Sequence, residues 1–395
     1  MKNKLPNDWK EVELKDVCLN SGQYGSGASA MEYSKDKPRY VRITDIDELG
    51  NLKKDSLVSP NKIENDYFLE EGDLLFARSG SVGKCYLHRK EKGDYQYAGY
   101  LIRFKPNKEI VLPEYLFFYT KTPQYWGWIK SRAESKKVTM SNINAKDYSS
   151  LNVLLPPLET QKQIVAILER AERLREKRKR ANDLSAQYLK SVFYEMFGNL
   201  HKNSKKFSMV KLKEIADIVR NSILPQNILD NENYIGLEDI ESETGRIIKI
   251  NSVSNGDLKS NKFIFDYNFI LYGKLRPYLN KITLPKFKGI CSTDILPILP
   301  KRDKSNKYYL AFLLRDKYYI NLATDRSVGA NLPRLSPNEL EDFDIPLPPI
   351  ELQNKFSYFI IEFEKLKEKQ RQSNEKINDL YNSLMQKAFV GEMIK

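Results

Sequence analysis

The sequence predicts a mixed α+β protein built as a tandem repeat, in which each of two globular domains is followed by a long helix. Short runs that alternate apolar and polar residues predict strands, and two long periodic segments predict helices. The second long segment repeats the first without gaps: Pro156 corresponds to Pro348 and Phe197 to Phe389, an offset of 192 residues at both ends (348 minus 156, 389 minus 197). This period is far longer than that of a solenoid repeat, so the chain contains two similar halves.

The first half predicts a compact domain of strands and helices over residues 1–153. Glycine-rich turns are expected at residues 22–27 and 79–84. An aromatic-rich helix is expected over residues 113–129, where a proline stands at the first position. Short alternating or apolar runs predict a short edge element and three strands, at residues 9–17, 40–46, 72–78 and 97–105.

The second half predicts the same order of elements, with small changes of offset that insertions in loops would produce. Matching segments occur at residues 210–215, 234–240, 269–276 and 308–314. The framework positions agree and the loops differ. This pattern is expected of two copies of one scaffold whose loops have diverged to contact different ligands.

The two long segments predict helices that lead out of proline pairs, and they divide the chain into residues 1–153, 154–198, 199–345 and 346–395. Some 40 residues of helix would form a rod of roughly 60 Å. The apolar stripe has coiled-coil-like spacing, is interrupted by the basic run at residues 173–180, and needs a partner, for which the other copy is the obvious candidate. Chain length alone allows either orientation of the pair. The packing positions predicted on the two helices are Ile164, Leu168, Ala171, Leu174, Tyr188, Val192, Phe356, Ile360, Phe363, Leu366, Leu380 and Leu384.

Composition and charge favour a nucleic-acid partner. The 395 residues are 41% hydrophobic and 30% charged, as in ordinary globular proteins, and the net charge of +13 with a pI near 9.2 favours a polyanion over a merely soluble basic surface. No apolar run is long enough to span a membrane and the N-terminus lacks a signal-peptide core, so we expect a cytoplasmic protein. Three scattered cysteines and two isolated histidines predict no disulfide framework and no metal site.

No motif in the sequence predicts catalysis. Residues 79–84 (SGSVGK) lack the first glycine and the final Ser or Thr of a phosphate-binding loop. Residues 22–27 (GQYGSG) neither follow a clear strand nor open a long helix, as a dinucleotide site requires. Residues 155–158 (LPPL) lack the leading Asn or Asp of the amino-methyltransferase motif, and no acidic cluster with a following lysine indicates a metal nuclease. We therefore predict no catalytic residues and no metal ligands.

Basic, hydroxyl and aromatic residues gather instead at the ends of the predicted strands. Arginine, lysine and asparagine can bind phosphates or base edges, and serine and tyrosine can position the backbone, so a set that recurs in matching places favours DNA contact over solvated loops. The candidates are Tyr24, Ser26, Arg78, Ser79, Ser81, Lys84, Lys136 and Lys137 in the first half and Lys274, Arg276, Tyr278, Lys281, Arg326, Ser327, Asn331 and Arg334 in the second.

Proline pairs with a following glutamine open both long segments, and three further segments occur with them in a fixed order. These residues are Pro156, Pro157, Gln161, Pro348, Pro349 and Gln353, with residues 72–80 (GDLLFARSG), 269–281 (FILYGKLRPYLNK) and 329–335 (GANLPRL). In these residues the whole chain resembles the specificity subunit of type I restriction-modification enzymes. Two departures concern the loops: residues 138–143 (VTMSNI) differ from residues 331–335 (NLPRL), and Asn268 stands where the first half has Asp73.

The resemblance implies two target-recognition domains, each reading one half of a bipartite DNA sequence, held apart by two antiparallel helices that form a coiled-coil-like spacer. It implies a non-catalytic chain without a cofactor of its own in a host-defence complex. Two modification subunits would methylate adenine with S-adenosylmethionine, and restriction subunits would use ATP and Mg2+ to translocate and cut DNA. The alternatives are a free-standing DNA-modifying or DNA-cleaving enzyme and a non-catalytic protein scaffold.

Overall fold

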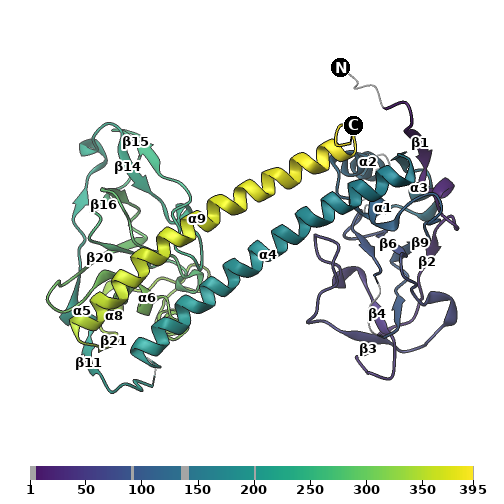
Figure 1. Ribbon diagram of the computed structural model, residues 1–395. Helices are drawn as coiled ribbons and strands as arrows, with labels where there is room; N and C mark the ends of the chain where they lie inside the picture. The colour runs from purple at the N-terminus through teal and green to yellow at the C-terminus, as the bar shows by residue number, and fades with distance from the viewer. Residues whose placement is uncertain (1–5, 90–92, 135–141, 200–201, 395) are drawn as a thin grey trace. The chain divides into compact units, whose positions relative to one another are not determined.

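The computed structural model describes residues 6–89, 93–134, 142–199 and 202–394, and the chain divides into two compact units. Unit 1 comprises residues 1–179 and 372–395, and unit 2 comprises residues 180–371. The two long helices, α4 (Leu158–Phe197) and α9 (Ile350–Ala388), each contribute to both units (Figure 1). The compact units therefore do not follow the two sequence repeats, because each takes in part of the helix that closes the other repeat. No helix in the described ranges is long and apolar enough to cross a membrane.

Unit 1 is built on a four-stranded antiparallel sheet in the order β2, β9, β6, β7. Its central strand β6 is completely buried, which confirms the prediction of a buried strand within residues 72–78. A parallel pair, β4 with β8, and two antiparallel pairs, β3 with β5 and β1 with β10, complete the strands. The bounds are β1 Lys10–Glu13, β2 Gln23–Tyr24, β3 Ala30–Glu32, β4 Arg39–Val41, β5 Val58–Pro60, β6 Leu74–Ala77, β7 Cys85–Leu87, β8 Tyr95–Tyr97, β9 Leu101–Phe104 and β10 Asn152–Leu155.

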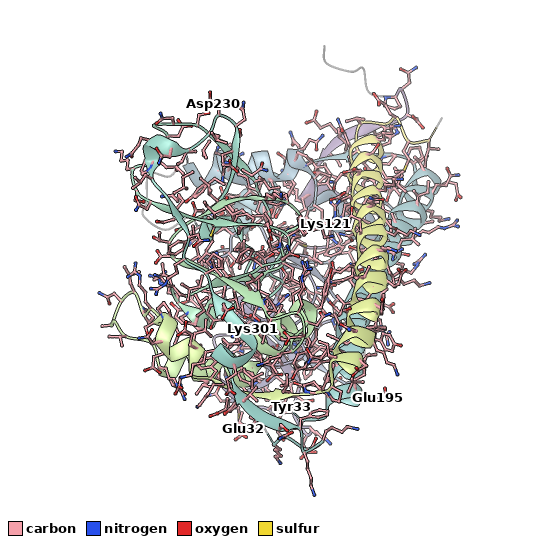
Figure 2. The ribbon with its side chains drawn as sticks, turned by 90° about the vertical axis from the view of Figure 1, so that its left-hand side faces the viewer. Glu32, Tyr33, Lys121, Glu195, Asp230 and Lys301 are labelled. Carbon is pink, nitrogen blue, oxygen red and sulfur yellow. The ribbon has the colours of Figure 1, made fainter. Side chains whose placement is uncertain are left out.

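The helix predicted over residues 113–129 is wrong in its continuity: the structure has α1 (Pro113–Tyr119) and α2 (Pro123–Glu134). The Thr120 and Thr122 hydroxyls donate to carbonyls of the preceding turn, and proline at the start of α2 supplies no N–H to continue α1. Lys121, labelled in Figure 2, lies in this break and its Nζ bonds Glu172 of α4 at 2.7 Å. The break thus fastens α1 to the long helix. A third short helix, α3, spans Ala145–Ser149.

Two predicted strands are also shorter than expected, for the same reason in each unit. The strand predicted at residues 40–46 ends at Val41 and is followed by a 3-10 helix, η2 (Ile43–Asp45). The Asp45 carboxylate accepts the backbone N–H of Arg42 and closes this turn. In unit 2, Asp239 accepts from Gly236 in the same way, so residues 234–240 form the end of a strand followed by η5 (Leu237–Asp239). In both units an aspartate at the third position of the 3-10 helix accepts the backbone N–H of the residue before the helix, and this hydrogen bond ends the strand early.

Unit 2 contains a four-stranded sheet in the order β12, β20, β17, β18 and a five-stranded sheet in the order β13, β16, β19, β14, β15. Strand β11 pairs with β21 just before α9, as β1 pairs with β10 before α4. The helix predicted at residues 308–314 is confirmed as α6. The strands are β11 Ser208–Lys211, β12 Ala216–Ile218, β13 Ser222–Ile223, β14 Glu232–Ile235, β15 Asn251–Val253, β16 Lys262–Phe265, β17 Ile270–Gly273, β18 Ile282–Thr283, β19 Gly289–Cys291, β20 Ile295–Pro300 and β21 Asp344–Leu347, and the short helices are α5 Leu212–Ile215, α6 Lys307–Leu314, α7 Lys317–Asp325 and α8 Pro337–Glu341.

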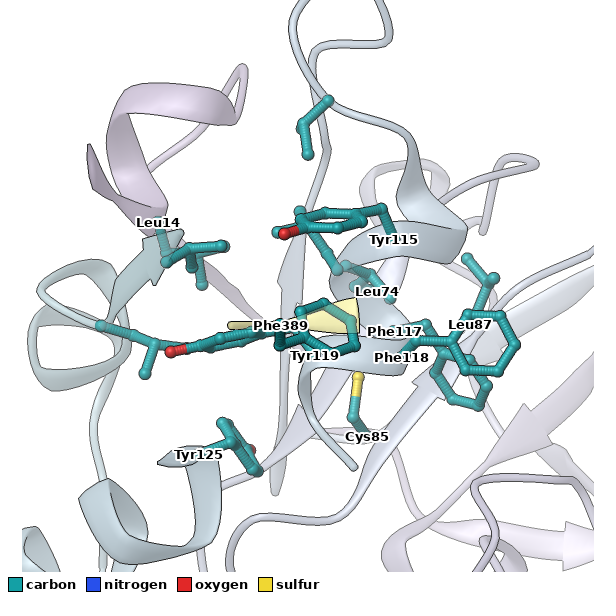
Figure 3. Packing of buried hydrophobic residues seen from close by; sticks show 14 of the residues in the cluster. Leu14, Leu74, Cys85, Leu87, Tyr115, Phe117, Phe118, Tyr119, Tyr125 and Phe389 are labelled. Atoms are coloured by element: carbon teal, nitrogen blue, oxygen red, sulfur yellow. The ribbon is translucent and has the colours of Figure 1, made fainter. Parts of the chain in front are cut away.

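Each core is completed by the end of a long helix that began in the other unit. In unit 1 the Phe389 ring, just after α9, lies 5.1 Å from the Tyr115 ring and 5.6 Å from the Tyr119 ring (Figure 3). In unit 2 the Phe197 ring, at the end of α4, lies 4.8 Å from Tyr309 and 5.4 Å from Phe356. The repeat correspondence of Phe197 with Phe389 is therefore also a structural one.

Candidate nucleic-acid interface

The two units hold their candidate residues on equivalent pairs of loops. In unit 1 the backbone N–H of Ile143 donates to the carbonyl of Arg78 at 2.9 Å, and in unit 2 that of Leu335 donates to Lys274 at 3.0 Å. Isolated bridges join the next residues of the same segments, Ser79 with Asn142 and Leu275 with Arg334. The loop after each central strand is thus fixed to the segment before α3 or α8, and some of the predicted residues lie at that junction.

In unit 1 the junction contains an arginine stacked on a tyrosine. The Arg78 guanidinium carbon lies 4.7 Å from the centre of the Tyr24 ring, and the Tyr24 hydroxyl accepts the N–H of Ala145 at 3.1 Å. The backbone N–H of Arg78 donates to Tyr100, whose side chain is 66% exposed. Among the described residues no group bonds the buried Nε of Arg78. Ser79 and Ser81 are half-buried at the same loop, so a cation, two aromatic rings and hydroxyls share one surface.

Other candidates of the first half lie inside the domain or are already engaged. Ser26 is 1% exposed and its Oγ donates to Glu64 at 2.6 Å. The Lys84 ammonium pairs with Glu48 at 2.7 Å and lies 3.5 Å from the carbonyl of Ile46, which fixes the loop to the turn after η2. In unit 2 the Lys281 ammonium donates in the same manner to the first residue of η5, at 2.9 Å. Lys136 and Lys137 lie outside the described residues.

In unit 2 the junction is built on a left-handed backbone. Arg276 and Asn280 have φ of 51° and 52° and flank the 3-10 helix η6 (Pro277–Leu279), a conformation that is rare for residues other than glycine. Its place is fixed because the N–H of Arg276 donates to Pro333 at 2.7 Å. The Arg276 side chain itself is exposed, with one guanidinium nitrogen 3.4 Å from the carbonyl of Asn331.

A network of hydrogen bonds, from buried Asn280 to exposed Glu243, supports this loop. The Asn280 amide donates to the Glu243 carboxylate at 3.1 Å, and Arg315 donates to the Glu243 carbonyl. Burial lowers the pKa of the Arg315 guanidinium from its usual value. Glu243 also has a left-handed backbone, at φ 62°. Two of the three residues with a left-handed backbone, Asn280 and Glu243, are thus joined by a side-chain hydrogen bond, and Arg276 is held through its own backbone N–H.

The remaining candidates of unit 2 divide into exposed and engaged groups. Tyr278 and Asn331 are exposed beside Arg276. The Arg334 Nε pairs with Asp294 at 3.1 Å while its side chain remains 46% exposed. Lys274 is half-buried in the loop. Arg326 instead pairs with Glu339 at 3.5 Å, and the Ser327 hydroxyl donates to the preceding helical turn, so these two residues close α7.

Sequence reasoning missed four exposed or charged residues at these junctions: Tyr100, Asp294, Val328 and Leu332. Asp294 occupies in unit 2 the place that Tyr100 has in unit 1, because each carbonyl accepts the equivalent loop N–H, from Lys274 and Arg78. A signal was present for Asp294, since it directly precedes the apolar run 295–300, which is typical of a buried strand. The exposure of Val328 and Leu332 could not be predicted from the sequence, because apolar residues in a basic loop are usually assigned to a core.

The glutamine that follows each proline pair is a buried clamp. The Gln161 amide donates to Pro156 at 2.9 Å and Ile110 at 3.0 Å, and its oxygen accepts the N–H of Leu112 at 2.9 Å. Gln353 makes the equivalent bonds to Pro348, Lys304 and Asn306 at 2.9, 3.1 and 2.9 Å. Both side chains are fully buried. The motif therefore joins the start of each long helix to the loop before α1 or α6.

Within unit 1 the parts of α4 and α9 run antiparallel. Arg175 donates to Asn378 and Arg178 donates to Ser373, both at 3.0 Å, so partners descend along one helix as they ascend along the other. The Arg175 guanidinium also lies 4.3 Å from the centre of the Tyr381 ring. Arg175 and Arg178 of the basic run at residues 173–180 thus serve contacts between the helices. The charged segment at residues 173–180 is therefore only partly a solvent-exposed face, because two of its side chains form polar contacts with α9.

Within unit 2 the two helix segments leave an apolar groove open. Gln370 donates to Ser185 at 3.0 Å and the Tyr188 ring lies 6.0 Å from Phe359, again in antiparallel order. The groove is lined by Leu184, Ser185, Tyr188, Phe359, Glu362, Phe363 and Leu366. Of the predicted packing positions in either unit, Ile164, Leu168, Ala171, Phe356, Ile360 and Phe363 are buried, Val192 and Leu384 are half-buried, and Leu174, Tyr188, Leu366 and Leu380 are exposed.

The described residues offer little for acid-base or metal chemistry. No group of three or more His, Cys, Asp or Glu side chains that could hold a metal ion occurs among them. His88 is buried, 5.0 Å from the Tyr95 ring, and His201 lies outside the described residues. Burial raises the pKa of the Cys18 thiol to about 12, so this thiol is a poor nucleophile near neutral pH.

Comparison with known proteins gives one consistent family. A model of the type I restriction modification DNA specificity domain matches residues 6–184 and again residues 204–379. The specificity subunit of the Escherichia coli type I restriction enzyme EcoDI is 23% identical over 432 aligned residues, covering 99% of this chain and 90% of that protein. A putative type I specificity subunit of Methanocaldococcus jannaschii, MjaX, is 25% identical over 425 residues, covering 98% and 94%. The crystal structure of a type I S subunit from M. genitalium has the same fold, with a TM-score of 0.59 at 13% identity over 98% of both chains.

Proposed function

Because the chain belongs to the type I restriction-modification DNA specificity family, we propose that it is the DNA-reading subunit of a complex in which partner chains perform catalysis. Each unit reads one half of a bipartite double-stranded target and thereby directs adenine methylation and restriction. One observation carries this proposal: the same backbone hydrogen bond, from Ile143 to Arg78 and from Leu335 to Lys274, joins two loops that present cationic and aromatic side chains in both units.

The chemistry of these two clusters suits DNA. Arg78 over Tyr24 and the exposed pair of Arg276 and Asn331 provide groups that bind guanine edges, adenine edges or phosphates. The clusters place different side chains at equivalent loop positions, such as Arg78 and Lys274, as two readers of different half-sites should. The net charge of +13 adds attraction that does not depend on sequence.

The partners are two modification subunits, with restriction and translocase subunits in addition. S-adenosylmethionine, ATP and Mg2+ belong to those partners, and this chain contributes no catalytic residue. The open apolar groove on the helices of unit 2 and the exposed Leu174 and Leu380 on those of unit 1 provide surface for docking. Because the repeat gives both units similar helix pairs, two copies of one modification subunit can each use an equivalent surface.

Exchange of one domain tests the proposal. Cells would express the chain with its cognate modification subunit, and sequencing of modified bases would report both half-sites. Replacing residues 1–153 with the equivalent domain of another specificity subunit should change one half-site and leave the other. A change in both halves, or in neither, would overturn the assignment of one reader to each unit.

Two further measurements separate the alternatives. The purified chain alone, with Mg2+ or S-adenosylmethionine, should neither cut nor methylate DNA, and either activity would favour a free-standing enzyme. Binding to duplex DNA should weaken steeply as salt rises, because neutralising phosphates releases counterions. An absence of DNA binding at low salt, in the full complex as well, would favour a protein scaffold.

A further inference from the structure

Aliphatic side chains project from the DNA-reading loops of unit 2. Val328 is 80% exposed and Leu332 is 45% exposed, and both belong to the segment that joins α7 to α8. Solvent exposure of aliphatic residues is ordinary when they are scattered. Here the two lie four positions apart in one short loop, beside the exposed polar groups Arg276, Asn331 and Arg334.

The loop that carries them is a fixed hairpin. Val328 and Arg334 exchange two backbone hydrogen bonds, each of 3.0 Å. Gly329 has φ of 116°, and a Cβ there would lie 3.0 Å from the carbonyl of Leu332. Pro333 restricts the return strand, and its carbonyl accepts the N–H of Arg276. The aliphatic side chains are therefore held outward before any ligand binds.

The neighbouring groups indicate what these side chains contact. A two-stranded ribbon fits the major groove of B-DNA, where arginine and asparagine distinguish base pairs by their hydrogen bonds. In that groove the thymine C5-methyl group is the apolar feature that an aliphatic side chain reads. The side chains that unstack bases from the minor groove are Phe, Leu, Ile, Met or Pro, and the more exposed of the two aliphatic residues, Val328, is not of these types.

Building on the proposed function, we propose that Val328 and Leu332 determine specificity in unit 2 by contacting thymine methyl groups in the major groove of its half-site. Arg276 and Asn331 bind the adjacent edges and set the register. The sequence offset of 192 places Lys136 of unit 1 opposite Val328, so the two readers differ at this position. The methyl contact is accordingly assigned to the half-site of unit 2.

Deoxyuridine tests this contact because it lacks only the methyl group of thymidine. The full chain, assembled with its cognate modification subunits, would select duplexes from two randomised libraries, one containing thymine and one containing uracil throughout. The exchange of residues 1–153 identifies which half-site belongs to unit 2. That half-site should require thymine, and its affinity should fall about fourfold for each methyl removed, which corresponds to about 0.8 kcal/mol.

Matched variants locate the contact. Val328→Ala and Leu332→Ala should lose the preference for thymine over uracil, with an unchanged Tm because both side chains are exposed in the free protein. Leu229→Ala removes a 69% exposed aliphatic side chain outside the two loops and should select as the parent does.

The outcomes distinguish this inference from the proposed function. Failure to recover any split target would overturn the proposed function itself. A split target whose unit 2 half lacks thymine, or one that is bound equally with uracil, would overturn only the methyl contact. If the variants lose affinity equally for both libraries, the aliphatic side chains act by another route, and the inference also fails.

Discussion

At the scale of single residues, the sequence predicts which side chains recur but not what they bond. Gln161 and Gln353 stand out as part of the proline-pair motif, and a glutamine in a polar helix would ordinarily be exposed. Their burial depends on a loop about 50 residues earlier in the chain, as the bonds from Gln161 to Ile110 and Leu112 show. The same limit applies to Ser26, which sequence alone places on a loop and the fold places inside the domain. Contacts so distant in sequence leave no local pattern.

Replacing Gln161 with leucine should destabilise unit 1. The change removes the side-chain partner of the buried Pro156 carbonyl and of two partly buried groups, the Ile110 carbonyl and the Leu112 N–H, so we expect a loss of about 1–3 kcal/mol in the free energy of unfolding. Urea unfolding followed by circular dichroism would measure it. Gln163→Leu, on an exposed position of the same helix, is the control and should change little. Equal stability of the two variants would contradict the clamp.

Replacing Arg276 with glycine should separate stability from recognition. Glycine tolerates the φ of 51° that arginine adopts here, so the free energy of unfolding should stay the same or rise by up to about 1 kcal/mol. Binding to the selected duplex should nevertheless weaken, because the exposed guanidinium is lost. Arg276→Lys keeps the charge and loses the planar fork, so it should retain phosphate attraction while relaxing base preference. If Arg276→Gly proved both less stable and fully active, the left-handed turn would serve folding only.

At the scale of elements, periodicity predicts the long helices, the buried strand β6 and the helix at residues 308–314, but local capping decides where elements end. Thr120 and Thr122 interrupt an aromatic run that reads as one helix, and Asp45 closes a turn within an apparent strand. These side chains compete for backbone groups in ways that the apolar pattern does not record. The repeat also relates Phe197 to Phe389 without revealing in which unit each ring packs.

Truncating either phenylalanine should therefore act on one unit at a time. Phe389→Ala removes a ring from the core of unit 1 and Phe197→Ala removes one from unit 2, each with a loss of about 3–5 kcal/mol expected for a large buried aromatic. Hydrogen exchange should show faster exchange in β6 and β9 for the first variant and in β17 and β20 for the second. Tyr358→Ala, at a 72% exposed position of α9, is the control. Faster exchange in both units from either variant would mean that they unfold together.

At the scale of the whole molecule, the duplication could be predicted from the sequence, because 192 residues separate corresponding positions at both ends of the long helices. The boundary between the compact units could not be predicted from the sequence, because it falls within the two long helices, which belong to both units. The polar contacts of Arg175 and Arg178 with α9 explain why the apolar stripe can be interrupted without loss of the helix pair in unit 1. In the proposed function, such a pair acts as a spacer whose length matters more than its hydrophobicity.

Lengthening both long helices should change the gap between the half-sites and leave their sequences intact. An insertion of seven residues, about two turns or 10.5 Å of helix, preserves the repeat of the stripe. Placed in α4 between Leu174 and Leu184, with a matching insertion opposite it in α9, it should widen the gap by about three base pairs, at about 3.4 Å per pair. Sequencing of modified bases in cells that carry the modification subunit would report the gap. The same seven residues inserted beside Gly256, an open loop position, provide the control and should leave the gap between the half-sites unchanged.

Each added helical turn also rotates one end of the helix pair, so the longer protein can lose methylation while it still binds DNA. In that case the binding of the complex would be measured with duplexes of graded gap length. A preference for the original gap in that measurement would show that the helices do not set the distance.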